Sequence, residues 1–115
     1  LSTGSYNTAV GGEALENITT AQNNIALGAF AGRSETTGNS QIFIGLSAGQ
    51  SINNASVASG ENVIIGHVAA PDRTGGTENV LIGSLVNYTG VGTGNNNVVI
   101  GRYAAANRNS FNYGK

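Results

Sequence analysis

The sequence contains no cysteine, methionine or tryptophan, one proline, one histidine and only 10% charged residues. Without cysteine, neither a disulfide scaffold nor a cysteine-ligated metal site is possible. Five basic residues against six acidic ones provide no basic surface, so we expect no nucleic-acid partner. No stretch approaches the roughly 20 consecutive apolar residues of a membrane-spanning helix, so we expect no membrane insertion.

Bulky apolar residues are also scarce. Leu, Ile, Val and Phe account for 27 of the 115 residues, whereas Gly, Asn, Ser and Thr account for 54. So low an apolar content borders on that of disordered chains, although the net charge of −1 argues against simple disorder. The length suits one domain, and because the chain starts with Leu1 rather than Met we expect a piece of a longer protein.

An internal repeat organises these few apolar residues. Six glycines recur at spacings of 17, 17, 21, 17 and 18 residues: Gly11, Gly28, Gly45, Gly66, Gly83 and Gly101. Four residues before them stand Asn7, Asn24, Gln41, Asn62, Asn79 and Asn97. The three residues between are TAV, IAL, IFI, VII, VLI and VVI, which hold 15 of the 27 bulky apolar residues.

Each apolar triplet, bounded by Asn and Gly, predicts a short β-strand. A rung of about 17 residues cannot bury its own apolar side, but stacked rungs cover one another. The sequence therefore predicts an all-β fold, a parallel β-solenoid or β-roll of about six rungs over residues 1–106. The longer step between Gly45 and Gly66 predicts a bulging loop within 50–61.

The fixed positions of the repeat suggest structural roles. We expect each glycine to form a corner of the coil, either because it needs a positive φ or because another backbone comes close. The Asn before each strand is expected to form a side-chain amide ladder between rungs or to tolerate a left-handed corner. The Ala found three residues after most of these glycines suggests an inward position where only a small side chain fits.

Alternation within each strand places its first and third side chains on one face and its middle side chain on the other. Both sets are apolar, which indicates that both faces are buried, one inside the coil and one against a partner. The simplest such partner is an identical chain related by a rotation axis. We assign the middle positions to the interface between identical chains, which the resemblance described next implies to be a homotrimer: Ala26, Phe43, Ile64, Leu81 and Val99.

Segments 7–20, 23–40 and 95–105 resemble the Asn-Thr-Ala-φ-Gly-x-x-Ala-Leu repeats of bacteriophage tail fibres and tailspikes. They are also similar to the head repeats of trimeric autotransporter adhesins, whose unit is usually shorter. The phage resemblance implies a trimeric β-helical shaft or tip on the virion. The adhesin resemblance implies a trimeric β-roll on the bacterial cell surface. No family residue with a catalytic role maps onto this chain.

Candidates for chemistry are few, and we expect no enzyme activity, cofactor or metal site. His67 is a lone histidine after a corner glycine, where we expect an exposed loop residue. Glu61 and Glu78 lie 17 residues apart and should stack on adjacent rungs. A carboxylate pair of this kind is what a polysaccharide-cleaving tailspike would need, and the other interpretation is a solvated charge ladder.

Candidates for binding are aromatic and basic residues outside the triplets. The richest group lies near the C-terminal end: Arg102, Tyr103, Arg108, Phe111 and Tyr113. The alternative for Phe30 and Tyr103, two residues after a corner glycine, is packing between rungs. Residues 107–115 are expected to be a cap or a linker to a downstream region.

The function expected from these features is attachment of a bacteriophage tail fibre or tailspike to the bacterial surface. The partners would be two identical chains and a bacterial surface polysaccharide or outer-membrane protein. The alternatives are the head of a bacterial trimeric adhesin that binds host surface or matrix, and a polysaccharide-degrading tailspike segment.

Overall fold

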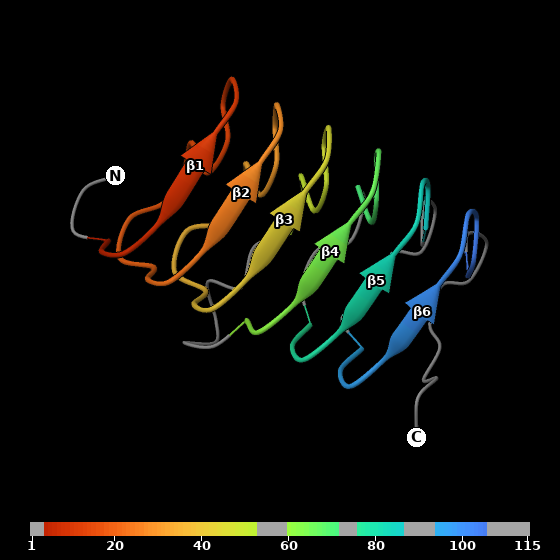
Figure 1. Ribbon diagram of the computed structural model, residues 1–115. Helices are drawn as coiled ribbons and strands as arrows, with labels where there is room; N and C mark the ends of the chain where they lie inside the picture. Colours follow the sequence, from red (N-terminus) through yellow and green to blue (C-terminus); the bar gives the residue numbers. More distant parts are fainter. Residues whose placement is uncertain (1–3, 53–59, 72–75, 87–93, 106–115) are drawn as a thin grey trace.

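The computed structural model describes residues 4–52, 60–71, 76–86 and 94–105, and these form an all-β coil (Figure 1). Its six strands coincide with the six predicted triplets: β1 (Thr8–Val10), β2 (Ile25–Leu27), β3 (Ile42–Ile44), β4 (Val63–Ile65), β5 (Val80–Ile82) and β6 (Val98–Ile100). They form one parallel sheet in the order β1 to β6. The prediction of a parallel β-solenoid is confirmed.

Strand pairing repeats without slippage from rung to rung. Between β2 and β3, for example, Ala26 lies opposite Phe43 and Leu27 opposite Ile44. Between strands the chain turns away from the sheet and returns, so that corresponding segments of successive rungs stack (Figure 1). Each side chain of the repeat is therefore covered by the residue at the same position of the next rung.

The corner glycines are confirmed, and both expected reasons apply: a positive φ and the close approach of another backbone. Their φ angles lie between 125° and 142°, in a region that only glycine adopts readily. A Cβ atom on Gly28 would lie 2.6 Å from the carbonyl oxygen of Gly45. The row of glycines therefore lets successive rungs approach through backbone alone.

Three further rows of residues adopt left-handed backbone, and most of their members are not glycine. One row lies just before the Asn ladder. The other two lie two and four residues after the corner glycine, and Phe30, two residues after Gly28, has a φ of 62°. Such a conformation costs an L-residue roughly 1–2 kcal/mol. Hydrogen bonds between rungs hold it in place, as where the Phe30 N–H donates to the Gly12 carbonyl at 2.9 Å.

The core lies between the sheet and the row of small residues that follows the corner. Ala31, Ala48 and Ala69 are fully buried, which confirms the small inward position. The ring of Phe43 lies between Gly32 and Gly49, because a Cβ atom on either glycine would come within 2.5 Å of it. The largest buried side chain thus fits only because two neighbouring rungs carry glycine there.

The assignment of the middle strand positions to a homotrimer interface is wrong. Within a single chain these side chains are 0–6% exposed: Ala26, Phe43, Ile64, Leu81 and Val99. They point into the coil and pack against the small residues of the opposite wall. The first and third positions of each strand therefore form the outer face.

The remaining expectations on organisation fall partly outside the described residues. Ile52 and Gly60 keep the places of the repeat, so the extra residues of the longer rung fall within 53–59, outside the described part. The expected cap or linker at 107–115 also lies outside it, and the coil is described up to Ala105. The first rung, although β1 is exposed at all three residues, keeps its full pairing with β2.

Candidate functional site

Two of the five predicted receptor-binding residues are described, in the turn after β6. The guanidinium carbon of Arg102 lies 4.7 Å from the centroid of the Tyr103 ring, a cation–π contact. Both side chains are exposed, and the Tyr103 N–H donates to the Ser84 carbonyl of the previous rung at 3.2 Å. The structure thus places an aromatic and cationic pair at the surface, whereas Arg108, Phe111 and Tyr113 lie outside the described residues.

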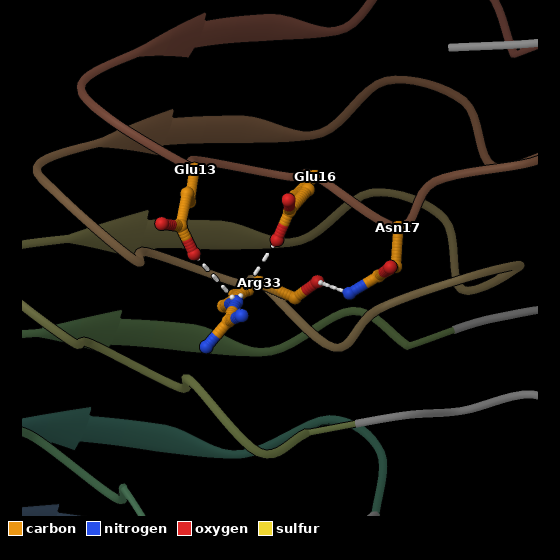
Figure 2. A network of polar contacts seen from close by, with 4 residues as sticks. All are labelled: Glu13, Glu16, Asn17 and Arg33. Carbon is orange, nitrogen blue, oxygen red and sulfur yellow. Dashed lines mark hydrogen bonds and ion pairs between the residues drawn. The ribbon is translucent and has the colours of Figure 1, made fainter.

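A second aromatic and cationic pair, Phe30 with Arg33, lies near the other end of the coil. The Arg33 guanidinium carbon is 5.7 Å from the Phe30 ring centroid, and its Nε lies 2.9 Å from carboxylate oxygens of both Glu13 and Glu16. Figure 2 shows this network, in which the Asn17 side chain also donates to the Arg33 carbonyl at 2.7 Å. These contacts join the first two rungs.

The Arg33 network carries a net negative charge, because two carboxylates face one guanidinium. The hydrogen bond to Glu16 and the negative charge of Glu13 raise the pKa of the Arg33 guanidinium above its usual value. Because all three side chains are about 40–46% exposed, solvent screens the attraction and the ion pairs add little stability. The cluster is therefore a surface contact between the first two rungs.

The other candidates for catalysis, His67, Glu61 and Glu78, lie on the surface. His67 is exposed, as predicted for a loop residue. Glu61 and Glu78 are exposed at the same place of adjacent rungs, and the Glu78 N–H donates to the Gly60 carbonyl at 3.0 Å. Within residues 4–52, 60–71, 76–86 and 94–105, no three His, Asp or Glu side chains lie close enough to share a metal ion.

The predicted amide ladder is present and runs along the inside of the coil. Four of the five later ladder residues donate a side-chain N–H to the side-chain oxygen of the rung before; Asn79 Nδ2, for example, reaches Asn62 Oδ1 at 3.0 Å. Gln41 is the exception and donates its main-chain N–H to Asn24 Oδ1. The second proton of Asn62 goes to the Gly76 carbonyl at 2.8 Å. These side chains are fully buried from Asn24 onward, so the ladder satisfies polar groups that would otherwise be costly to bury.

A buried carboxylate, Glu35, pairs with the one ladder residue that is not asparagine, Gln41. Its Oε1 accepts main-chain N–H groups of Thr36, Thr37 and Gly38 at 2.7–3.1 Å. Its Oε2 accepts the side-chain amide of Gln41, the one glutamine of the ladder. Sequence reasoning missed this pair, although a signal exists: Glu35 occupies the place of two buried isoleucines, Ile18 and Ile52, in the adjacent rungs.

The outer face of the sheet is a continuous apolar surface that runs over all six strands. Eleven of its twelve side chains are Val, Ile or Leu, and Thr8 is the exception. Toward the two ends, these side chains are 38–65% exposed: Val10, Ile25, Leu27, Val98 and Ile100. The middle rungs are half-buried there. Nothing in the described part of the chain covers this face (Figure 1).

No protein-family model matches the chain, and comparisons with curated proteins and with solved structures give no match. The described residues contain no helix that is long and apolar enough to cross a membrane.

Proposed function

We propose that this chain is a structural and receptor-binding segment of a bacteriophage tail fibre or tailspike, assembled as a homotrimer that attaches the virion to the bacterial surface. The observation that carries the proposal is the uncovered apolar face of a parallel sheet whose other face already fills the core. Parallel sheets are normally buried on both faces, and an exposed apolar patch of this kind is typical of an interface.

The geometry of the face suits rotational symmetry about an axis along the coil. Its side chains form two straight columns, because all six strands stack in register. Copies placed around such an axis bring the same rung of each chain together, which buries the columns over their whole length. The number of three chains comes from the resemblance to phage and adhesin repeats.

Two adjacent isoleucines with opposite orientations test the assembly. Ile64 is fully buried in the coil, whereas Ile65 lies on the outer face at the centre of the sheet. We expect Ile65→Asp to yield a folded monomer, because its charge disrupts only the interface between chains. We expect Ile64→Asp to prevent folding, because an isolated charge in an apolar core is far too costly.

Circular dichroism and sedimentation velocity together separate these outcomes. Thr20→Asp, at an exposed place away from the sheet, is the matched control and keeps the assembly of the unmodified chain. A fully trimeric Ile65→Asp chain would show that the outer face is not the interface.

Attachment would use the exposed Arg102–Tyr103 pair, presented three times by the trimer. An aromatic ring stacks on sugars and a guanidinium donates hydrogen bonds, so a bacterial surface polysaccharide is the favoured receptor. Three copies of one weak site on a rigid frame gain affinity because later contacts are intramolecular.

A glycan array probed with the folded oligomer tests the attachment. We expect binding to bacterial surface glycans that is lost on Arg102→Ala with Tyr103→Ala and kept on Arg33→Ala, the equivalent change at the other aromatic pair. Binding to host matrix proteins instead would favour the adhesin function. Shortening of a bound polysaccharide would favour a degrading tailspike.

A further inference from the structure

Two rows of residues border the outer face of the sheet, one along each edge. The entry row comes just before the ladder amide of each rung: Tyr6, Asn23, Ser40, Glu61, Glu78 and Asn96. The exit row comes just after the corner glycine of each rung: Gly12, Ala29, Leu46, His67, Ser84 and Arg102. Because all six strands run in parallel from one row to the other, the two rows lie on opposite edges of the sheet (Figure 1).

The two rows differ in the sign of the charge that they carry. Both carboxylates, Glu61 and Glu78, belong to the entry row, whereas the imidazole of His67 and the guanidinium of Arg102 belong to the exit row. All four side chains are exposed, and neither Glu61 nor His67 has an ion pair within the part of the chain that the structure describes. The edges of one chain are therefore complementary to the opposite edges of another.

Rotation about an axis along the coil brings these edges together. The strands of all copies then run in the same sense around the axis, so the exit row of one chain meets the entry row of the next at the same height. Glu61 and His67 flank the same strand, β4, which places His67 at the height of Glu61 of the next copy. Arg102 faces Asn96 of the next copy, which is uncharged.

The width of a rung suits a prism of three such sheets. Packed sheets lie about 10 Å apart, so each sheet lies roughly 5 Å from the axis and each side of the prism is roughly 17 Å wide. Residues 61 to 67 span at most about 20 Å, because each extended residue advances about 3.3 Å. The entry and exit rows therefore lie at the edges of the prism, where neighbouring copies meet.

We infer that His67 of each chain forms an ion pair with Glu61 of the next chain around the trimer, so that association tightens as the imidazole gains its proton. This regulation by pH rests on the proposed homotrimer. Contact with a carboxylate favours the charged imidazole, so the trimer binds more protons than the separated chains and is more stable at mildly acidic pH. The effect is lost below about pH 4, where carboxylates become protonated.

The surroundings of His67 leave Glu61 of the next copy as its nearest charged group. Leu46 and Ser84 flank His67 in its own row, and neither titrates in this range. Arg102 lies two rungs further along the row, roughly 10 Å away, and Glu78 of the next copy lies one rung above Glu61, about 5 Å along the axis. The attraction of the carboxylates therefore acts on His67 at closer range than the repulsion of Arg102.

Sedimentation equilibrium at about pH 8 and about pH 6 tests the inference. An exposed ion pair strengthens a contact roughly threefold, and each trimer has three such contacts, so we expect the association constant to rise roughly 30-fold at the lower pH. His67→Gln should remove this rise, because His67 is the only histidine of the chain. An equal association constant at the two pH values, or a rise that persists in His67→Gln, would overturn the inference.

Two carboxylate variants test the register of the contact. Glu61→Gln and Glu78→Gln each remove one exposed carboxylate of the entry row, but only Glu61 lies at the height of His67. We expect Glu61→Gln to abolish the rise at the lower pH and Glu78→Gln to keep most of it. Equal effects of the two variants, or the opposite order, would overturn the inference.

Cross-linking tests the contact directly, because the chain contains no cysteine of its own. Glu61→Cys and His67→Cys chains, refolded together from urea and treated with a short bismaleimide, should give covalent pairs on a denaturing gel. Either variant alone should give none, because the contact joins two different positions of neighbouring copies. Trimers that form no such pairs would overturn the inference and leave the proposed homotrimer standing, whereas a folded single chain at about pH 6 would overturn both.

Discussion

Replacing Phe43 by alanine removes the largest side chain of the core and tests how the coil is packed. The ring lies between Gly32 and Gly49, where any added Cβ atom would clash with it. A Phe-to-Ala truncation in a core costs roughly 3–5 kcal/mol. With a urea dependence of about 2 kcal/mol per molar, the midpoint of unfolding should fall by roughly 2 M.

The interaction between Phe43 and Gly32 makes the prediction specific. In the unmodified chain Gly32→Ala meets the ring at 2.5 Å, whereas in the Phe43→Ala background this clash is absent. The remaining costs are that of a left-handed alanine, roughly 1–2 kcal/mol, and a shift of the Leu15 side chain, whose Cδ2 would lie 2.9 Å from the new Cβ atom. Ala70 occupies the corresponding place of another rung with a φ of 48°, so the backbone accepts alanine there.

Urea unfolding followed by circular dichroism at one fixed protein concentration gives the four free energies of this double-mutant cycle. We expect Gly32→Ala to cost clearly less in the Phe43→Ala background than alone. If the two changes add within about 0.5 kcal/mol, the ring does not fill the space between the glycines and the packing described here is refuted.

Three further changes should give graded effects in the same unfolding assay. Glu35→Ala removes the acceptor of three main-chain N–H groups and of the Gln41 amide, so we expect the free energy of unfolding to fall by more than about 3 kcal/mol. Glu35→Gln keeps one oxygen and should lower it less. Equal decreases in the two variants would contradict the hydrogen-bonding role. Gly66→Ala forces a φ of 141° on alanine and places its Cβ atom against the next rung, so the free energy of unfolding should fall by at least about 2–3 kcal/mol. A Cβ atom at Gly12 meets nothing within 4 Å, so Gly12→Ala should not destabilise the coil. Arg33→Ala should leave the midpoint unchanged, because its ion pairs are exposed, and a clear decrease would show that they support the first two rungs.

The strands, the corners and the ladder could be predicted because each recurs at one place of the repeat. A single triplet such as TAV at 8–10 says little, but six aligned triplets indicate six stacked strands. The glycine and asparagine rows follow from the same alignment, since only a stacked coil brings equivalent residues together. The repeat therefore predicted long-range contacts that normally cannot be inferred from a single sequence.

The choice of the inner face could not be made from alternation, because both sets of strand positions are apolar. The size of the side chains points to the inner position in β2 but not in β3, β4 or β5. Ala26 stands at the middle position beside the larger Ile25 and Leu27, and a thin coil lined by alanines has room for the smaller residue inside. Phe43 breaks this rule and is explained only by the glycines that lie beside it in space. Ile64 and Leu81 are no smaller than their neighbours in the strand, so size does not mark the inner position there.

Of the candidate site, the sequence located the exposed Arg102–Tyr103 pair but not its ring-stacking geometry, which depends on the left-handed backbone at Tyr103. Glu35 was missed because its partners become neighbours only through a tight turn and the longer side chain of Gln41. Left-handed residues other than glycine were missed for a similar reason. Hydrogen bonds from the neighbouring rungs hold them in that conformation, and local sequence preference opposes it.

The central claim is that the outer apolar face is covered by identical chains. The most direct test is the molar mass of the folded chain, measured by light scattering during size-exclusion chromatography. The account predicts the mass of three chains at micromolar concentration. A stable, folded single chain, with the strand signal intact in circular dichroism, would contradict it.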